Sequence, residues 1–278
     1  MIFTMKKMAL LALSVLLLVT ACAGCSKSGN VIQSFADAGK QGLIPPFFGG
    51  IANSFQNNLV QENRYLLIFE GLKTTVIISV LSTILGTFLG AIVCFMRMSS
   101  NEILKVLAKT YISILRGTPV LVFLMLIFYV VFASVNIDPV IVSVIAFGMN
   151  FAAYVAEIYR SGIESIDKGQ SEAGIAMGFS RVNTFLFIIL PQTVQRILPV
   201  YKGEFISLVK MTSIVGYIAV QDLTKASDII RSRTFDAFFP LIMVAVFYYL
   251  ISWSLMLVME YAERLANPKL RRKQIADA

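Results

Sequence analysis

The stretch from residue 181 to 221 is the part of the sequence whose side chains could bind a small polar molecule. It is largely apolar, but four charges and three helix-weakening residues interrupt it: Pro191, Arg196, Pro199, Lys202, Gly203, Glu204 and Lys210. Ionisable residues inside a membrane are costly and usually face protein or water. Interrupted apolar segments also mark binding sites in transport proteins, because the freed backbone groups line a cavity. The stretch therefore predicts a pathway for a polar solute.

A structural interpretation of the same charges stays open. The membrane crossing could begin near Ile197, with Arg196 and Lys202 extending their charged ends to the inner surface. Lys202 and Glu204 could also neutralise their neighbours without binding a solute.

Glu157 and Lys210 are the two charges that we expect to face the interior between helices. A cation binds a carboxylate and an acid binds an ammonium group, so this pair suits a zwitterion. The alternative is that both are structural charges, with Glu157 at the membrane interface. The predicted pathway and gate residues are Asn150, Tyr154, Glu157, Glu204, Ser207, Lys210, Thr212 and Ser213.

The composition excludes several other kinds of chemistry. The chain has no histidine, and its three cysteines (Cys22, Cys25 and Cys94) are too few for a disulfide framework or a four-thiolate zinc site. The sequence has no Gly-x-x-x-x-Gly-Lys-Ser/Thr phosphate loop. We therefore expect no catalytic residue, no metal site and no cofactor held by this chain. The net charge of +8 is better explained by loops at a membrane surface than by nucleic acid.

Long apolar blocks must position these side chains. Apolar residues make up 57% of the chain and charged residues 14%, whereas soluble domains average roughly 45–50% and 25%. Uncharged blocks cover residues 74–96, 117–137, 139–156 and 237–259, and about 20 apolar residues span a bilayer as a helix. With the interrupted stretch 181–221, they predict an all-α membrane protein of about five transmembrane helices.

The distribution of charge orients these helices. The loop after the first block carries Arg97, Lys105, Lys109 and Arg116 against Glu102, a net charge of 4 − 1 = +3. The positive-inside rule places such a loop in the cytoplasm. The loop 133–139 has no lysine or arginine and is expected outside. The hydrophilic stretch from residue 160 and the basic tail 269–273 are then expected in the cytoplasm.

The N-terminus has the features of an export signal. Two lysines precede an apolar stretch that ends in Val19-Thr20-Ala21-Cys22, as in secretory signals. This ending resembles a bacterial lipoprotein cleavage box, which makes Cys22 a candidate for lipidation. The alternative is an uncleaved signal anchor with incidental cysteines. We expect residues 1–21 to be the signal segment and 22–64 an exported linker that is too short to hold a two-lobed binding domain.

The most specific motif lies in the predicted cytoplasmic stretch. The sequence Gly169-Gln-Ser-Glu-Ala-Gly-Ile-Ala-Met-Gly178 is followed, nine residues later, by Ile188-Ile-Leu-Pro191. Small residues permit close approach between helices, and Gly178 allows a bend that a residue with a Cβ atom would resist. An ordinary surface helix pair is the alternative interpretation.

This motif resembles the EAA loop of ABC-importer permeases in every spacing, and Gly174 replaces the second alanine. The elements Arg116-Gly-Thr-Pro119, Ala153–Ile163 and Lys210-Met-Thr-Ser213 resemble the polar amino-acid subfamily, with Met211 in place of a polar residue. The resemblance covers about residues 65 to 265. It implies that the loop, about residues 160–191, couples the chain to an ATPase through Ser165, Gly169, Gln170, Glu172, Ala173, Gly174, Ala176, Met177 and Gly178.

The resemblance implies a permease subunit that imports polar amino acids across the bacterial cytoplasmic membrane. Its partners would be ABC ATPase subunits that bind ATP and magnesium, an extracytoplasmic substrate-binding protein, and a second permease that is either identical or related. Residues 65–278 would form the transmembrane permease domain. An importer of another small solute, such as an opine or a sulfur compound, is the alternative within this class, and an ion-coupled carrier is the alternative outside it.

Overall fold

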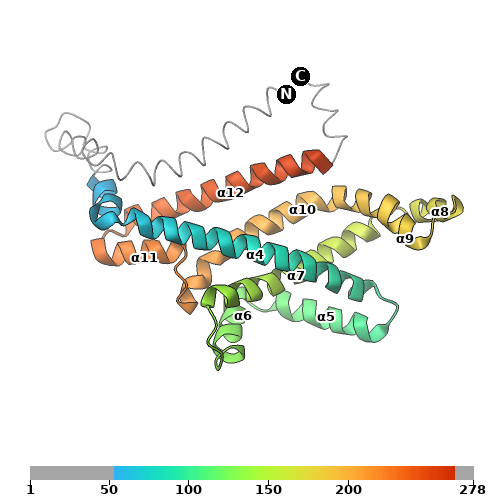
Figure 1. The fold of residues 1–278 in the computed structure, drawn as a ribbon, viewed down its shortest axis with the longest axis horizontal. Helices are drawn as coiled ribbons and strands as arrows, with labels where there is room; N and C mark the ends of the chain where they lie inside the picture. Colours follow the sequence, from blue (N-terminus) through green and yellow to red (C-terminus); the bar gives the residue numbers. More distant parts are fainter. Residues whose placement is uncertain (1–52, 267–278) are drawn as a thin grey trace, which may run out of the picture. The chain divides into compact units, whose positions relative to one another are not determined.

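The computed structural model describes residues 53–266, and every regular element within this range is a helix. The predicted all-α class is therefore confirmed. The signal segment 1–21, the lipidation candidate Cys22 and most of the linker lie outside the described residues, as does the basic tail. Figure 1 gives the order of the helices along the chain.

Three helices are long and apolar enough to cross a membrane: α4 (Tyr65–Met98), α7 (Pro139–Glu164) and α12 (Phe238–Ala266). Two bent helix pairs raise the number of candidate spans to five, in agreement with the predicted number. The first pair joins α5 (Glu102–Gly117) to α6 (Val120–Leu126) and its π-helical continuation η3 (Ile127–Val131). The second pair joins the helical run Arg181–Ile218 to α11 (Leu223–Thr234).

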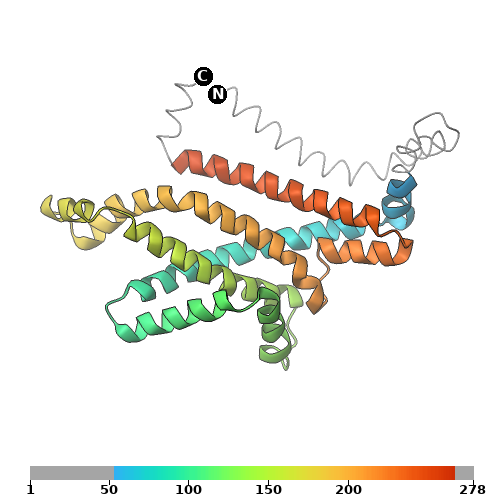
Figure 2. The same ribbon diagram turned by 180° about the vertical axis from the view of Figure 1, so that it is seen from behind.

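The predicted charged loop after the first crossing is a helix, α5, so that expectation was wrong. The Asn101 side chain accepts a hydrogen bond from the backbone N–H of Ile103, at 2.9 Å, and caps the helix start. Ala108, Ile112 and Leu115 form its buried face, whereas the basic residues lie outside that face. The chain then turns by 109° into α6 at the Gly-Thr-Pro sequence (Figure 2), because proline restricts the residue before it and cannot continue a helix.

Helix α7 extends eight residues beyond the predicted block 139–156. Asp138 caps its start and Pro139 occupies the first turn, where a missing N–H costs nothing. The hydrophilic residues from Arg160 onward therefore begin inside this helix and not in a loop. The coupling segment is correspondingly shorter than predicted.

The segment 181–218 is one continuous helical run instead of a broken crossing. It comprises α9 (Arg181–Thr184), the π-helix η4 (Phe185–Ile189), α10 (Leu190–Met211) and the 3-10 helix η5 (Thr212–Ile218). Pro191 cannot donate a hydrogen bond to the turn before it, and the wider π-helical turn lies in that position. Pro199 is accommodated inside α10.

The described chain divides into two compact units, residues 53–77 with 212–257 and residues 78–211 with 258–266. In the first unit, Gly71 of α4 lies against the start of α11, where a Cβ atom would come 2.6 Å from the carbonyl oxygen of Asp222. The Asp222 carboxylate caps α11 and accepts a hydrogen bond from the Tyr248 hydroxyl at 3.1 Å.

The segment before α4 is also fixed within the first unit. Its π-helix η1 (Gln56–Val60) and 3-10 helix η2 (Gln61–Asn63) lie beside α11 and the start of α12 (Figure 1). The buried Asn58 amide donates to Asp236 at 2.8 Å and accepts from the Thr234 hydroxyl at 2.8 Å. These bonds tie residues that are far apart in sequence.

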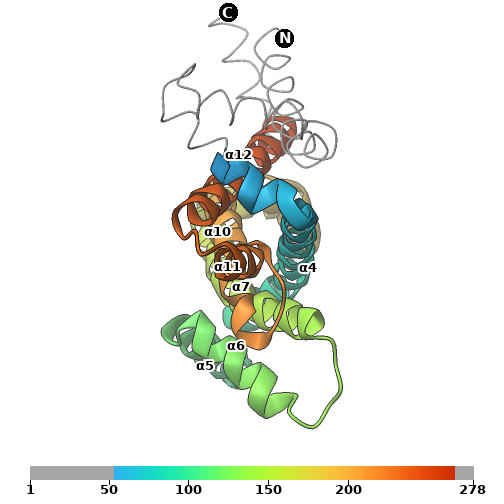
Figure 3. The ribbon, with the colours of Figure 1, turned by 90° about the vertical axis from the view of Figure 1, so that its left-hand side faces the viewer.

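Helix α7 is the centre of the second unit. Glycines on α4 allow it to approach closely: a Cβ atom at Gly86 would lie 2.7 Å from the carbonyl of Gly148, and one at Gly90 would lie 2.8 Å from Val155. The Tyr111 hydroxyl of α5 donates to the Met149 carbonyl at 2.7 Å. The end-on view in Figure 3 places α5 and α6 on one side of α7.

Candidate functional site

The motif segment folds as a helix, a tight bend and a second helix start. Helix α8 (Lys168–Ala176) is capped by Asp167, whose carboxylate accepts from the Gly169 N–H at 2.7 Å. Gly178 has φ +87° in the bend, and Ser180 caps the start of α9. Only glycine adopts such a φ without strain, so the predicted bend at Gly178 is confirmed. Helices α8 and α9 project beyond the ends of α7 and α10 (Figure 1).

The packing around position 174 explains why glycine stands there in place of the alanine of the motif. Gly174 is the one buried residue of α8, and a Cβ atom there would come 2.7 Å from the Thr184 methyl group and 2.9 Å from Ile188. The small residue therefore lets α8 pack on the start of the 181–211 helix.

Most of the remaining motif residues are exposed. Glu172, Ala173, Ala176, Met177 and Gly178 lie on the surface of the second unit. They are accompanied by large apolar side chains that are also exposed, namely Ile175, Met177, Phe179 and Val182. An exposed apolar surface of this kind is typical of a protein interaction site.

Two polar contacts join the motif segment to α10. The Arg196 guanidinium donates to the Ser165 carbonyl and, at 3.2 Å, to the Ser165 hydroxyl. The Gln192 amide donates to the Gln170 side chain at 3.3 Å. These bonds join the first turns of α10 to Ser165 at the end of α7 and to Gln170 of α8.

Two of the charges that interrupt the stretch 181–221 have partners within the second unit. Arg196 binds Ser165, as described, and the Lys202 ammonium pairs with Glu263 of α12, with less than a fifth of either side chain exposed. Lys202 therefore neutralises Glu263 and not Glu204.

No contact joins Glu157 to Lys210 in the described chain, and their role as a zwitterion-binding pair stays a prediction. The Glu157 carboxylate accepts from Arg160 at 2.8 Å and lies 3.6 Å from Arg97. The Tyr201 ring of α10 packs against Phe151 of α7. Lys210 lies nine residues after Tyr201, which is about 13 Å along α10. Its side chain is exposed.

A polar face on α10 carries the remaining predicted residues of that helix. Gly203, Glu204, Ser207 and Lys210 fall within one 120° arc at about 100° per residue. Gly203 and Lys210 are exposed, whereas Glu204 and Ser207 are half-buried. The Ser207 hydroxyl donates to the Gly203 carbonyl at 3.0 Å. This face is unusual for a membrane helix because its polar groups lie on the side of α10 that does not pack against the other helices of the unit.

Arg116 lies close to this face, although the predicted site did not include it. Its guanidinium stands 5.0 Å from the centre of the Tyr154 ring and interacts electrostatically with Glu204. Within the described chain, neither Arg116 nor Glu204 has a hydrogen-bond or salt-bridge partner. The Arg116-Gly-Thr-Pro119 element was the available signal, but the sequence could not show that it ends a helix beside Tyr154.

The glycines next to Arg116 and Glu204 lie at open surface. A Cβ atom at Gly117 or Gly203 would meet no atom within 4 Å. The buried Asn150 amide donates to the Leu115 carbonyl at 3.0 Å and so fixes the end of α5 that carries Arg116. Asn150 thus supports the site from behind. Thr212 and Ser213 belong to η5 in the first unit, where Thr212 is buried.

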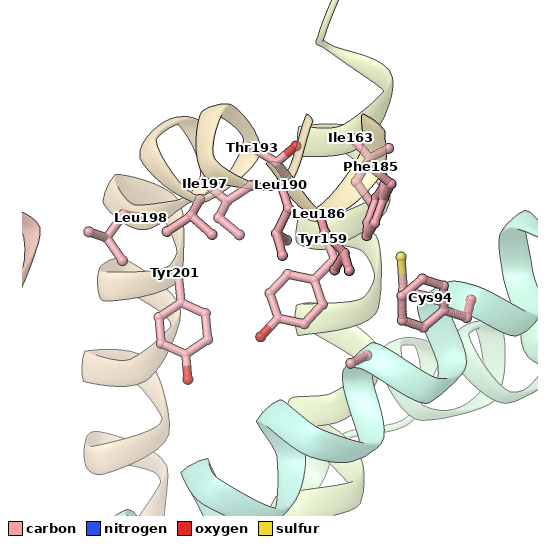
Figure 4. Close-up of a pocket in the computed structure, with 13 residues that line it drawn as sticks. Cys94, Tyr159, Ile163, Phe185, Leu186, Leu190, Thr193, Ile197, Leu198 and Tyr201 are labelled. Atoms are coloured by element: carbon pink, nitrogen blue, oxygen red, sulfur yellow. The ribbon is translucent and has the colours of Figure 1, made fainter. Parts of the chain in front are cut away.

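The second unit also contains an apolar cavity of about 430 Å³ between α4, α7 and the η4–α10 helix (Figure 4). Its walls include Cys94, Tyr159, Phe185, Leu190 and Tyr201. This cavity was not predicted, because its walls come from three separate helices whose packing the sequence does not reveal.

The described helices and site define a class of protein: a multi-spanning membrane protein with a projecting segment, α8–α9, next to a helix that carries a polar face. The family model for binding-protein-dependent transport system inner membrane components matches residues 82–271. The chain belongs to this family.

Two relatives are named for amino-acid transport. The chain is 37% identical over 209 residues to the L-cystine transport system permease protein TcyB of Bacillus subtilis (strain 168), covering 74% of this chain and 89% of the relative. It is 36% identical over 201 residues to the glutamine transport system permease protein GlnP of Escherichia coli (strain K12), covering 71% and 92%.

Solved structures share the fold. A chain of an amino acid ABC transporter, crystallised with histidines, matches with a TM-score of 0.65 and 36% identity, covering 71% of this chain and 93% of that one. A chain of the MetNI methionine ABC transporter matches with a TM-score of 0.63 at 18% identity, which shows the fold alone.

Proposed function

We propose that this chain is the permease subunit of an ATP-driven importer of polar amino acids. Family membership and the names of its relatives support an amino-acid substrate. The observation that carries the proposal is the position of Arg116 against the Tyr154 ring and of Glu204 on the polar face of α10, because neither charge has a hydrogen-bond or salt-bridge partner within the described chain.

This arrangement matches the chemistry of an α-amino acid. A guanidinium binds a carboxylate through paired hydrogen bonds, and a carboxylate binds an ammonium group. Because Arg116 and Glu204 interact without direct hydrogen bonds, a zwitterion between them would satisfy both charges. Ser207 and Lys210 continue the polar face along α10 and would form the rest of the pathway, with Thr212 and Ser213 near a gate. Glu157 would take part in the pathway only together with Arg97 and Arg160, with which it forms ion pairs.

The exposed motif segment supports a separate ATPase partner. Ile175, Met177 and Val182 present apolar surface around Gly178, and Glu172 offers a carboxylate to a basic groove. ATP and magnesium would be bound by that partner. ATP would favour one orientation of the transport pathway by binding one conformation more tightly, and a shift from 1:99 to 99:1 needs about 5.5 kcal/mol.

The remaining features of the proposal concern assembly and orientation. A second permease subunit, identical or related, would complete the pathway. An extracytoplasmic binding protein would deliver the substrate on the side of the N-terminal segment. The motif segment α8–α9 and the C-terminal tail would lie in the cytoplasm, as the distribution of basic residues predicts.

The site is tested by uptake in proteoliposomes that contain the chain, its ATPase and its binding protein. We expect Glu204→Gln and Arg116→Gln to reduce amino-acid uptake at least tenfold while ATPase subunits still co-purify. Lys109→Gln, which removes an exposed cation seven residues before Arg116 on α5, is the matched control and should transport normally. Unchanged uptake in both site variants would reject the site. Uptake of an opine or a sulfur compound in preference to amino acids would favour the alternative solute.

A further inference from the structure

The apolar cavity of the second unit lies between two contacts that join α4 to the η4–α10 helix. At one end the Thr87 and Tyr201 hydroxyls are hydrogen-bonded at 2.5 Å. At the other end the Phe95 and Phe185 rings meet edge to face, with centres 6.2 Å apart. Between these contacts the helices leave about 430 Å³ unfilled. The cavity is thus a defined feature of the packing.

The lining determines what can fill this space. Apolar side chains form almost all of the lining, and a bound water needs two to four polar partners. The Thr193 hydroxyl already donates to the Ile189 carbonyl and Tyr201 is bonded to Thr87. The Cys94 thiol donates to the Met98 sulfur, and the remaining side-chain polar group of the lining is the Tyr159 hydroxyl, at the same end as that of Tyr201 (Figure 4). The cavity therefore suits an apolar occupant and not ordered water.

The rim of the cavity shows where such an occupant comes from. Phe95 and Leu186 both line the cavity and are 60% and 44% exposed. An apolar rim on membrane-spanning helices opens to the hydrocarbon of the bilayer, where the available apolar molecules are lipid chains.

One basic residue lies where the lipid headgroup would be. Arg181 is one helical turn before Phe185, and residues four apart lie on the same side of a helix. Its side chain is exposed and has no partner within the described chain. A guanidinium in this position complements an anionic phosphate at the inner surface of the membrane, where anionic lipids are concentrated.

We propose that the cavity binds one acyl chain of an anionic phospholipid, with the headgroup phosphate on Arg181. The chain fills the space between Cys94, Tyr159 and Leu190. The lipid then supports η4, which connects the motif segment to α10.

The first test measures lipid retention and the reactivity of Cys94, which lines the cavity and is buried. The full chain is purified in detergent, depleted of lipid and titrated with dioleoyl phosphatidylglycerol. Native mass spectrometry counts the bound lipid, and peptide mapping measures alkylation of Cys94 by N-ethylmaleimide. We expect one tightly retained lipid and at least fivefold slower alkylation of Cys94 when it is bound.

Two tryptophan variants of adjacent residues on α4 separate the cavity from general effects of bulk. Ala91→Trp fills the cavity, and we expect it to abolish retention of the lipid. Ile92→Trp places the same ring on the exposed side of the helix and should bind lipid as the unmodified chain does. Equal retention in both variants, or Cys94 alkylation unaffected by lipid, would overturn the proposal.

Arg181→Gln tests the headgroup separately from the acyl chain. A basic residue near an anionic membrane surface contributes about a fivefold affinity, so this variant should lose about that preference for phosphatidylglycerol over dioleoyl phosphatidylcholine. Lys109→Gln is the control and should keep the preference. If unmodified protein binds both lipids equally, or if a second copy of the chain and not lipid protects Cys94, the assignment to an anionic phospholipid is wrong.

Discussion

Gly178 is the residue at which backbone conformation and proposed function are most directly connected. Its φ of +87° lies where side chains are disfavoured, and nothing lies within 4 Å of the position of a Cβ atom. Within the described chain, a substitution there therefore acts through the backbone and not through steric contact.

Gly178→Ala should destabilise the bend by about 1 kcal/mol and lower the number of amino acids transported per ATP hydrolysed. The measurement is the ratio of uptake to ATP hydrolysis in proteoliposomes. Gly216→Ala is the matched control, because its added methyl would meet only ordinary contacts at 3.6 Å or more. A normal ratio in Gly178→Ala would show that the bend does not couple the two reactions.

Glu172→Lys tests the surface of the same segment. Glu172 is exposed and has no partner within the described chain, so its replacement should leave folding unchanged. We expect the ATPase to bind at least fivefold more weakly, measured by co-purification across a salt series. Lys168→Glu on the same helix changes charge by the same magnitude and is the control. Equal ATPase binding in the Glu172→Lys chain would place the partner elsewhere.

At the residue scale, the sequence predicted the features that depend only on the spacing of residues in the motif. The bend at Gly178 and the small residue at Gly174 follow from the motif. The partners of the charged residues did not follow: Glu157 pairs with Arg97 and Arg160, and Arg116 lies over the Tyr154 ring. These partners depend on which helices are neighbours, and that is set by tertiary packing that no local pattern encodes.

At the scale of elements, α10 joins the motif segment to the proposed pathway. Its first turns hold Arg196 and Gln192, which bind the motif segment, and its later turns hold the polar face with Glu204. A rigid helix transmits displacement along its length, so α10 is the element that would convert motion of the partner into motion of the pathway.

Arg196→Met should weaken this connection. The loss of the bonds to Ser165 should lower the ratio of uptake to ATP hydrolysis at least threefold, while ATP hydrolysis itself persists. Lys168→Met removes an exposed cation from α8 and should leave the ratio unchanged. If both variants couple normally, α10 is not moved through Arg196.

The Lys202–Glu263 pair is expected to contribute to stability and not to transport. Both side chains are mostly buried, and removal of one partner of a buried pair costs about 3 kcal/mol or more because the other charge is left uncompensated. Lys202→Met should therefore lower the thermal unfolding temperature in detergent. The double variant Lys202→Met with Glu263→Met should recover most of the loss. A single variant as stable as the unmodified chain would exclude this role.

Element lengths were predictable only in part. The apolar blocks correctly indicated α4, α7 and α12, because a run of uncharged residues is a direct consequence of the bilayer. The helix α5 was missed because its amphipathic pattern includes four charges, and hydropathy alone indicates a loop there. The continuous helix from Arg181 was missed because Pro191 and Pro199 indicate breaks, whereas a π-helical segment and tertiary contacts tolerate both prolines.

At the scale of the whole molecule, family membership and the described site fit one mode of action. In the proposed function, the polar face on α10 would provide a route for a zwitterion, and the motif segment would provide a surface for a partner that supplies energy. Transport would then require an assembly of permease, ATPase and binding protein.

The most direct test of this account is amino-acid uptake by the reconstituted assembly. Proteoliposomes containing this chain and its ATPase are given a radiolabelled polar amino acid, with and without the binding protein and with ATP or a non-hydrolysable analogue. The account predicts accumulation against a gradient only when ATP and the binding protein are both present. Uptake that persists with the analogue and follows an ion gradient instead would contradict it.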